Sequence, residues 1–341
     1  MSANMSMLSP MINQTSAALL VSNELASTIM LIFERFLFPC IGVLGIAGNV
    51  TGIVALTREG FRNNSNVLLL SLSVSNVLFL IGINNILVHI YNSSDRAGFS
   101  FSEAINYVCY ILLLIWSLPY TMGVFTGPLI PVLITGERIL VIFGPFRAHV
   151  ILTPRRTIAV LLCFYLLTVV LFVYHEILGL QLKTYVINSV TTSLIVSSDM
   201  RRNHIDIGLV DLMETVVNYL TGIIPLSLIT VGCVVIGIKI ICVTKRRRQL
   251  TSSKVKANTK HGITKTTKTL LKICLLYICC YGFGFSLIFI FDSELLKHES
   301  SLKLVMIQVQ DLLMCTNCLG DFFIYCASNK RLWKSVTAWQ R

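Results

Sequence analysis

Long apolar stretches recur along the chain, and short polar segments separate them. A helix needs about 20 mostly apolar residues to cross the hydrocarbon core of a bilayer. These stretches do not alternate apolar and polar positions, as the strands of a membrane barrel do. Because backbone that faces lipid must satisfy its hydrogen bonds internally, each stretch is expected to be a helix. The pattern predicts seven transmembrane helices, over residues 36–56, 67–90, 107–143, 158–178, 212–243, 269–291 and 304–326.

The composition supports a single bundle in a membrane. Of the 341 residues, 55% are hydrophobic and 13% are charged, whereas a soluble domain carries about 25% charged residues. We expect an all-α membrane protein with an outer tail over residues 1–35, a seven-helix domain over 36–326 and an inner segment over 327–341. The inner segment has apolar residues on one helical face and basic residues beside them, which predicts a short amphipathic eighth helix on the membrane surface.

Lysine and arginine indicate how the bundle is oriented. Of the 28 basic residues, 21 fall in four segments, 58–62, 138–156, 239–272 and 330–341. Loops on the cytoplasmic side are the ones enriched in these residues. The N-terminus is therefore expected outside and the C-terminus inside. The net charge of +12 is a topology signal, and we expect membrane lipid rather than nucleic acid as a partner.

Three Asn-x-Ser/Thr triplets fall on the predicted outer side, beginning at Asn4, Asn13 and Asn92. Such a triplet accepts an N-linked glycan in an exposed outer segment. We expect glycans at these three positions. The similar triplet at Asn63 falls inside and is expected to stay unmodified.

No arrangement of residues indicates enzyme chemistry. The chain lacks paired carboxylates, a nucleophile beside a base, and histidine and cysteine at metal-ligand spacing. Most of the 11 cysteines lie within apolar runs, where they pack as small apolar side chains. We expect no catalytic residue and no cofactor.

A few polar residues interrupt the apolar runs. Polar side chains at membrane depth are costly and mark functional sites by default. Each has an ordinary explanation as well, because a buried asparagine often bonds only to a neighbouring helix and a charged side chain can extend to the membrane surface. They are Asn49, Asn76, Glu137, Arg138, Asn317 and Asp321.

Taken together, these residues resemble the rhodopsin-like G-protein-coupled receptors over about residues 36–338. The matching segments are Gly48-Asn49-Val50, Leu72-Ser73-Val74-Ser75-Asn76, Gly136-Glu137-Arg138-Ile139 with Pro145 after it, and Asn317 with Asp321-Phe322-Phe323-Ile324-Tyr325. They are similar, in order, to the family's G-N-V, L-A-x-A-D, E/D-R-Y and N-P-x-x-Y motifs.

The resemblance implies a receptor of the plasma membrane that binds an extracellular ligand and activates a heterotrimeric G protein. It implies that the G protein docks near Glu137, Arg138 and Pro145. The basic inner loop would contribute, through Arg246, Arg247 and Arg248. That loop is also explained by its proximity to anionic lipid, and both roles are compatible. A polar switch cluster is implied at Asn49, Asn76, Asn317, Asp321 and Tyr325.

The sequence departs from the family's pattern at several places. The second-helix aspartate and the seventh-helix asparagine look exchanged, as Asn76 and Asp321, which preserves one carboxylate and one amide. Asp321 is then the candidate to hold a sodium ion or a proton. The sixth run lacks the C-W-x-P motif, with Tyr281 in place of the tryptophan. The usual outer disulfide cannot form, because Cys109 has no cysteine opposite it in the second outer loop.

Counting from the matched motifs predicts a set of ligand-contacting residues. Asp311 is the most specific of them, since it is an acid in the outer part of an apolar helix that could pair with a cationic ligand or with a basic loop residue such as Arg201 or Arg202. Tyr120 stands where amine receptors have an aspartate, which disfavours a biogenic amine. The set is Tyr120, Val124, Asn218, Thr221, Tyr281, Phe285, Gln308 and Asp311.

The departures are typical of a divergent invertebrate receptor for chemical stimuli or for peptides. Two alternatives stay open. The prolines of the third run, Pro119, Pro128 and Pro131, tend to kink a helix, and a transporter or channel would contain broken helices. The third possibility is a receptor-like protein that no longer signals.

Overall fold

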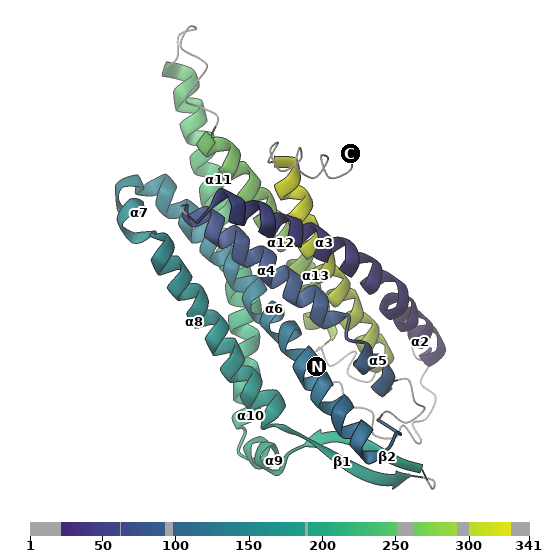
Figure 1. Ribbon diagram of the computed structural model, residues 1–341. Coiled ribbons are helices and arrows are strands. Elements are labelled where there is room, and N and C mark those ends of the chain that lie inside the picture. Colours follow the sequence, from purple (N-terminus) through teal and green to yellow (C-terminus); the bar gives the residue numbers. More distant parts are fainter. Residues whose placement is uncertain are drawn as a thin grey trace.

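The computed structural model describes residues 22–61, 63–92, 98–187, 190–250, 262–291 and 300–328. Within this part of the chain, seven helical segments are long and apolar enough to cross a membrane. They lie side by side as one bundle (Figure 1), which confirms the predicted seven-helix fold. The segments are Asn23–Arg58, Asn64–Asn92, Glu103–Phe143, Pro154–Ile177, Leu209–Val243, Thr267–Leu287 and Ser301–Ala327.

Several spans combine an α-helix with a short π-helical turn, labelled η. The elements in chain order are α2 (Asn23–Ile32), η1 (Phe33–Leu37), α3 (Phe38–Glu59), α4 (Asn64–Ile83), α5 (Ile86–Asn92), α6 (Glu103–Phe143), α7 (Pro145–Ile151), α8 (Pro154–Phe172), η2 (Val173–Ile177), β1 (Leu180–Ile187), β2 (Val190–Ser197), α9 (Asp199–Asp206), α10 (Leu209–Asn218), η3 (Tyr219–Ile223), α11 (Ile224–Leu250), α12 (Gly262–Phe291) and α13 (Ser300–Ser328).

The first span begins at Asn23 rather than at residue 36. Ser22 caps it, because its side chain accepts a hydrogen bond from the backbone nitrogen of Leu25 at 3.2 Å. Polar residues such as Glu24 and Glu34 lie in these outer turns. They lower the local hydropathy without breaking the helix, which is why the apolar run alone starts later.

The longest helix, α6, runs unbroken through its three prolines. Its 41 residues span about 60 Å at the rise of an α-helix, so it extends beyond the hydrocarbon core. It packs against α4, α8, α11 and α12. Two glycines allow α4 and α6 to approach closely: a Cβ on Gly82 would lie 2.3 Å from the backbone nitrogen of Tyr120, and one on Gly123 would lie 2.5 Å from the Cβ of Phe79.

A β-hairpin covers the outer end of the bundle (Figure 1). Strands β1 and β2 pair antiparallel, from Leu180 opposite Ser197 to Ile187 opposite Val190. The hydropathy pattern predicts no structure between the spans 158–178 and 212–243, because it marks spans and not outer loops. Both strands are rich in threonine, valine, isoleucine and leucine, which fit a pleated surface.

Hydrogen bonds attach this hairpin to α6 in the absence of a disulfide, since all 11 cysteines are free thiols. The buried Asn106 donates from Nδ2 to the hydroxyl of Ser193 at 2.8 Å. Tyr110 donates its hydroxyl to the carbonyl of Leu180 at 3.1 Å. An apolar cluster that includes Tyr91, Phe99, Tyr110 and Ile195 lies beneath. The hairpin is therefore held by packing and polar contacts.

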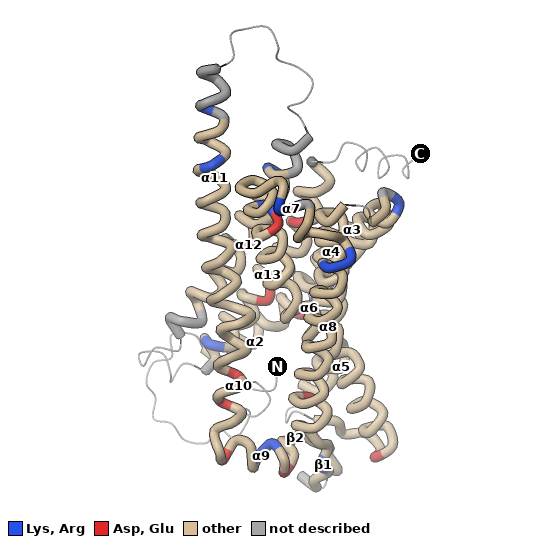
Figure 2. Tube along the Cα trace, turned by 90° about the vertical axis from the view of Figure 1, so that its left-hand side faces the viewer, with Lys and Arg blue, Asp and Glu red and all other residues tan. Residues whose placement is uncertain are grey.

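The two ends of the bundle differ in charge. Figure 2 shows lysine and arginine gathered toward the end where α7 lies, opposite the hairpin. This distribution fits the N-terminus outside and the C-terminus inside. Asn92 is exposed at the end of α5 on the outer side, so its glycosylation stays a prediction. Asn4, Asn13 and the amphipathic segment after residue 328 lie outside the described residues.

Replacing Asn106 with alanine is expected to loosen the hairpin. The change removes the donor to Ser193 and the side-chain oxygen that accepts from the backbone nitrogen of Phe101 at 3.1 Å. Hydrogen exchange of the amides in residues 180–197 is expected to speed up by about tenfold. Asn203→Ala, at an exposed position of α9, is the matched control. Unchanged exchange in the Asn106 variant would mean that the apolar cluster alone holds the hairpin.

Candidate functional site

A cavity of about 370 Å³ lies near the outer end of the bundle, between α6, η2, α9 and α10. Tyr120, Val124 and Asn218, all predicted to contact ligand, line it. Its size lies at the lower end of the range of about 300–1,000 Å³ that is usual for small-molecule sites. The structure therefore brings three of the eight predicted ligand residues to one cavity.

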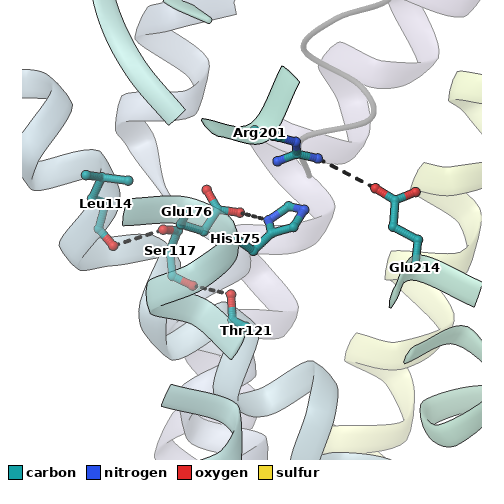
Figure 3. Close-up of polar contacts among 7 residues, drawn as sticks. All are labelled: Leu114, Ser117, Thr121, His175, Glu176, Arg201 and Glu214. Atoms are coloured by element: carbon teal, nitrogen blue, oxygen red, sulfur yellow. Dashed lines mark hydrogen bonds and ion pairs between the residues drawn. The ribbon is translucent and has the colours of Figure 1, made fainter. Parts of the chain in front are cut away.

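Four charged or titratable side chains also line this cavity, and Figure 3 shows them in two pairs. His175 and Glu176 form one pair, in which the imidazole Nδ1 lies 3.1 Å from the carboxylate Oε1. Arg201 and Glu214 form the other, with 3.6 Å between Nη2 and Oε1. Sequence reasoning did not select these residues for the site. The signal that was present is the polar sequence Tyr174-His175-Glu176 at the end of the fourth apolar run.

The same view shows two hydroxyl groups of α6, those of Ser117 and Thr121 (Figure 3). The hydroxyl of Ser117 donates to the carbonyl of Leu114 at 2.9 Å, and Thr121 donates to Ser117 at 3.0 Å. Both hydroxyls thus satisfy backbone carbonyls of their own helix. They line the cavity and give its α6 wall a polar strip.

The other predicted ligand residues do not line this cavity. Thr221 donates to the Val217 carbonyl at 2.9 Å, and Gln308 donates to Glu34 at 3.3 Å. Tyr281 stacks on Tyr277 with 4.1 Å between ring centroids. The ring of Phe285 lies against Gly222, where an added Cβ would come within 2.3 Å of it. Their predicted ligand contacts remain untested.

Asp311 has a specific neighbour in the bundle. Its carboxylate interacts with the hydroxyl of Tyr120. The loop arginines considered as its partners contact other carboxylates, Arg201 that of Glu214 and Arg202 that of Asp199. Tyr120 therefore joins the wall of the outer cavity to the seventh helix.

A polar cluster lies deeper in the bundle, where α3, α4 and α13 meet. Asn76 donates from Nδ2 to Asp321 Oδ2 at 3.1 Å and to Asn49 Oδ1 at 3.4 Å. Asn49 in turn donates to the carbonyl of Cys318 at 3.1 Å, and Asn317 lies 3.5 Å from Asp321. The four cluster residues Asn49, Asn76, Asn317 and Asp321 are buried, with exposed fractions of 2–5%.

The cluster adjoins a small void lined by Asn49, Asn76, Asp321 and Tyr325, with a volume of about 10 Å³. A space of this size holds about one water molecule. Oδ1 of Asp321 and Oδ1 of Asn317 are buried and have no hydrogen-bond partner among the described residues. A carboxylate and an amide oxygen are ligands that suit a hard cation. Among the described residues, no group of three or more His, Cys, Asp or Glu could hold a metal ion.

Glu137 and Arg138 are buried at the inner end of α6, with exposed fractions of 5% and 7%. The hydroxyl of Ser65 on α4 donates to Glu137 Oε1 at 2.8 Å and accepts from Arg138 Nη2 at 2.5 Å. Glu137 and Arg138 also form an ion pair at 3.6 Å. The two charges thus face α4 and do not extend to the membrane surface.

Pro145 begins α7 directly after this site. Arg246, Arg247 and Arg248 lie in the last turns of α11, and their side chains are outside what the structure describes. Their predicted contact with a G protein stays a prediction.

Comparison with family models identifies the fold. The model of the 7 transmembrane receptor (rhodopsin family) matches residues 48–325. The chain belongs to this family. Comparison with curated proteins gave no match. The receptor spans the plasma membrane seven times, and the family consists of receptors rather than enzymes.

Exchanging the two partners of the central contact tests the polar cluster of the receptor. Asn76→Asp would set two carboxylates face to face, and Asp321→Asn would set two amides there, since the native contact joins Asn76 Nδ2 to Asp321 Oδ2. Each single change is expected to cost about 1–3 kcal/mol of stability. The double variant restores the amide–carboxylate contact, so its thermal unfolding in detergent is expected to recover most of the loss. If both single variants are less stable and the double variant shows the summed loss, the exchange account is wrong.

Proposed function

We propose that this receptor binds an extracellular ligand in its outer cavity and, in response, activates a heterotrimeric G protein at its inner end. The observation that carries the proposal is the buried Arg138, held with Glu137 by one hydroxyl of the neighbouring helix. A buried guanidinium is costly at this depth. Its contacts with Ser65 and Glu137 support an inactive arrangement in which Arg138 is held, and from which it is released on activation. The released guanidinium would contact the G protein.

The mechanism is a shift between two arrangements of the bundle. A ligand that binds the active arrangement more tightly shifts a pre-existing equilibrium toward it. Tyr120 lines the cavity and contacts Asp311, so ligand contact at α6 reaches α13. The polar cluster of Asn49, Asn76, Asn317 and Asp321 would rearrange next, and the Ser65 contacts would open. Inner parts of α11 and α12 would then move apart, and Arg246–Arg248 would lie at the docking surface.

Asp321 supplies the titratable or cation-binding group of the cluster. Its oxygen Oδ1 and that of Asn317 would hold a sodium ion, or Asp321 would take a proton, in the inactive arrangement. Either charge neutralisation would stabilise a buried carboxylate. Tyr325, beside the void, is placed to follow the change.

The cavity favours a small molecule over a long peptide as the ligand. Its volume of about 370 Å³ suits a compact ligand. This supports a receptor for chemical stimuli. A transporter or channel is expected to contain a helix that is broken within the membrane. The proline-rich helix α6 is continuous instead.

Loss of Arg138 is expected to abolish coupling. We expect cells expressing the receptor to show agonist-independent or ligand-stimulated G-protein activation, measured as nucleotide exchange across G-protein subtypes. Arg138→Ala is expected to reduce this signal by at least about tenfold at equal surface expression. Arg156→Ala, which removes an exposed inner arginine bonded to the Val150 carbonyl, is the control. Equal signals from the receptor and its Arg138 variant would contradict the proposal, and the absence of any signal would favour a receptor that no longer couples.

Loss of Ser65 is expected to have the opposite effect. Ser65→Ala removes the hydroxyl that contacts both Glu137 and Arg138, so the inactive arrangement loses stability relative to the active one. Agonist-independent nucleotide exchange is expected to rise about threefold to tenfold. Ser71→Ala is a matched control on the same helix, because its hydroxyl contacts Tyr165 instead. A lower basal signal in the Ser65 variant than in the Ser71 variant would argue that Ser65 supports the active arrangement.

A further inference from the structure

The outer cavity combines an apolar body with a small group of charges. Its apolar walls come from α6, α8 and α10, and include Val124, Phe125, Leu171, Phe172, Val210 and Val217. The polar groups come from η2, α9 and α10: the Glu176 carboxylate beside the His175 imidazole, and the ion pair of Arg201 with Glu214. A ligand that fills this space therefore needs an apolar part and a polar or charged head.

Arg201 is the fixed member of its pair. Its side chain is 10% exposed, whereas that of Glu214 is 47% exposed. Arg201 also lies in the capped first turn of α9, where Ser198 accepts a hydrogen bond from its backbone nitrogen at 3.2 Å. The guanidinium thus stays in the cavity wall, while the Glu214 carboxylate can turn toward water at little cost.

The contact between Arg201 and Glu214 leaves room for a better one. At 3.6 Å it is longer than a hydrogen bond. A carboxylate that approaches a guanidinium in its plane makes two parallel hydrogen bonds, which is the geometry arginine favours. The Glu214 carboxylate is attached to α10, whereas a ligand carboxylate is free to take up this two-bond geometry with Arg201.

A cationic head group fits less well. It would compete with Arg201 for the Glu214 carboxylate, which lies 3.6 Å from the guanidinium. The buried guanidinium would then lose a nearby negative charge, which is costly in a low-dielectric wall. An anionic head group would take the place of the Glu214 carboxylate beside Arg201, and the Glu214 carboxylate would turn into water.

We propose that the outer cavity binds a small apolar organic anion, whose carboxylate displaces Glu214 from Arg201. Glu214 then acts as a tethered competitor that occupies the arginine when no ligand is bound. The inference rests on the proposed function only in using the same cavity as the receptor's ligand site.

Three probes with one body and different heads test the head group: phenylpropanoate, phenylpropanamide and phenylpropylamine. Saturable binding of each to the purified full-length receptor is measured calorimetrically in detergent. The carboxylate is expected to bind more tightly than the amide and the amine. Tighter binding of the amine, or no saturable binding of any probe at millimolar concentration, overturns the proposal.

Variants of the ion pair give results of opposite sign. Arg201→Gln is expected to weaken phenylpropanoate binding by about tenfold to a hundredfold, and Arg201→Lys to weaken it less. Glu214→Gln is expected to strengthen it, because the competitor is gone. A purely structural ion pair would lose affinity in both variants, and that result overturns the proposal. A gain in affinity also cannot come from misfolding.

The adjacent arginine is a matched control. Arg202 lies on the same short helix and pairs with Asp199 at 3.6 Å, but its side chain is 53% exposed. Arg202→Gln is expected to leave binding unchanged, and an equal loss in this variant overturns the assignment to Arg201. Because the readout is binding to the purified receptor, failure of G-protein activation would leave this inference standing.

Discussion

The amide–carboxylate contact between Asn76 and Asp321 is the interaction on which the inner half of the bundle depends. It joins α4 to α13 at 3.1 Å, and Asn49 brings α3 into the same cluster. A buried carboxylate is unfavourable in hydrocarbon unless donors surround it. The hydrogen bonds that stabilise the Asp321 carboxylate therefore fix α3 and α4 relative to α13. A cluster that is only partly satisfied, with Oδ1 of Asp321 unpartnered among the described residues, is suited to more than one arrangement.

The outer half depends on a different constraint. Its hairpin covers the bundle without a covalent link, and Asn106 and Tyr110 on α6 supply the polar attachments. α6 therefore performs three tasks along its length. It anchors the outer hairpin, lines the cavity at Tyr120 and Val124, and ends in Glu137 and Arg138. One continuous helix thus joins the outer hairpin, the cavity and the inner end of the bundle.

The spans and the members of the polar cluster could be predicted from the sequence, because hydropathy and the cost of buried polar groups belong to each residue and its neighbours. The contact between Asn76 and Asp321 was implied by the resemblance to the receptor family, relative to which the two residues look exchanged. The hairpin was missed, since its β-branched residues lie in an outer loop that hydropathy does not describe. The cavity charges at Arg201 and Glu214 depend on how α9 and α10 pack, and sequence spacing carries no information on that packing.

The central claim is that the bundle transmits a signal to a G protein and does not conduct solute. The most direct test reconstitutes the purified full chain into lipid vesicles with a panel of heterotrimeric G proteins. Nucleotide exchange on the outside and ion flux across the same vesicles are measured in one sample. The account predicts exchange on at least one G protein, above that of empty vesicles, with no ion flux above background. Ion flux without nucleotide exchange would contradict it.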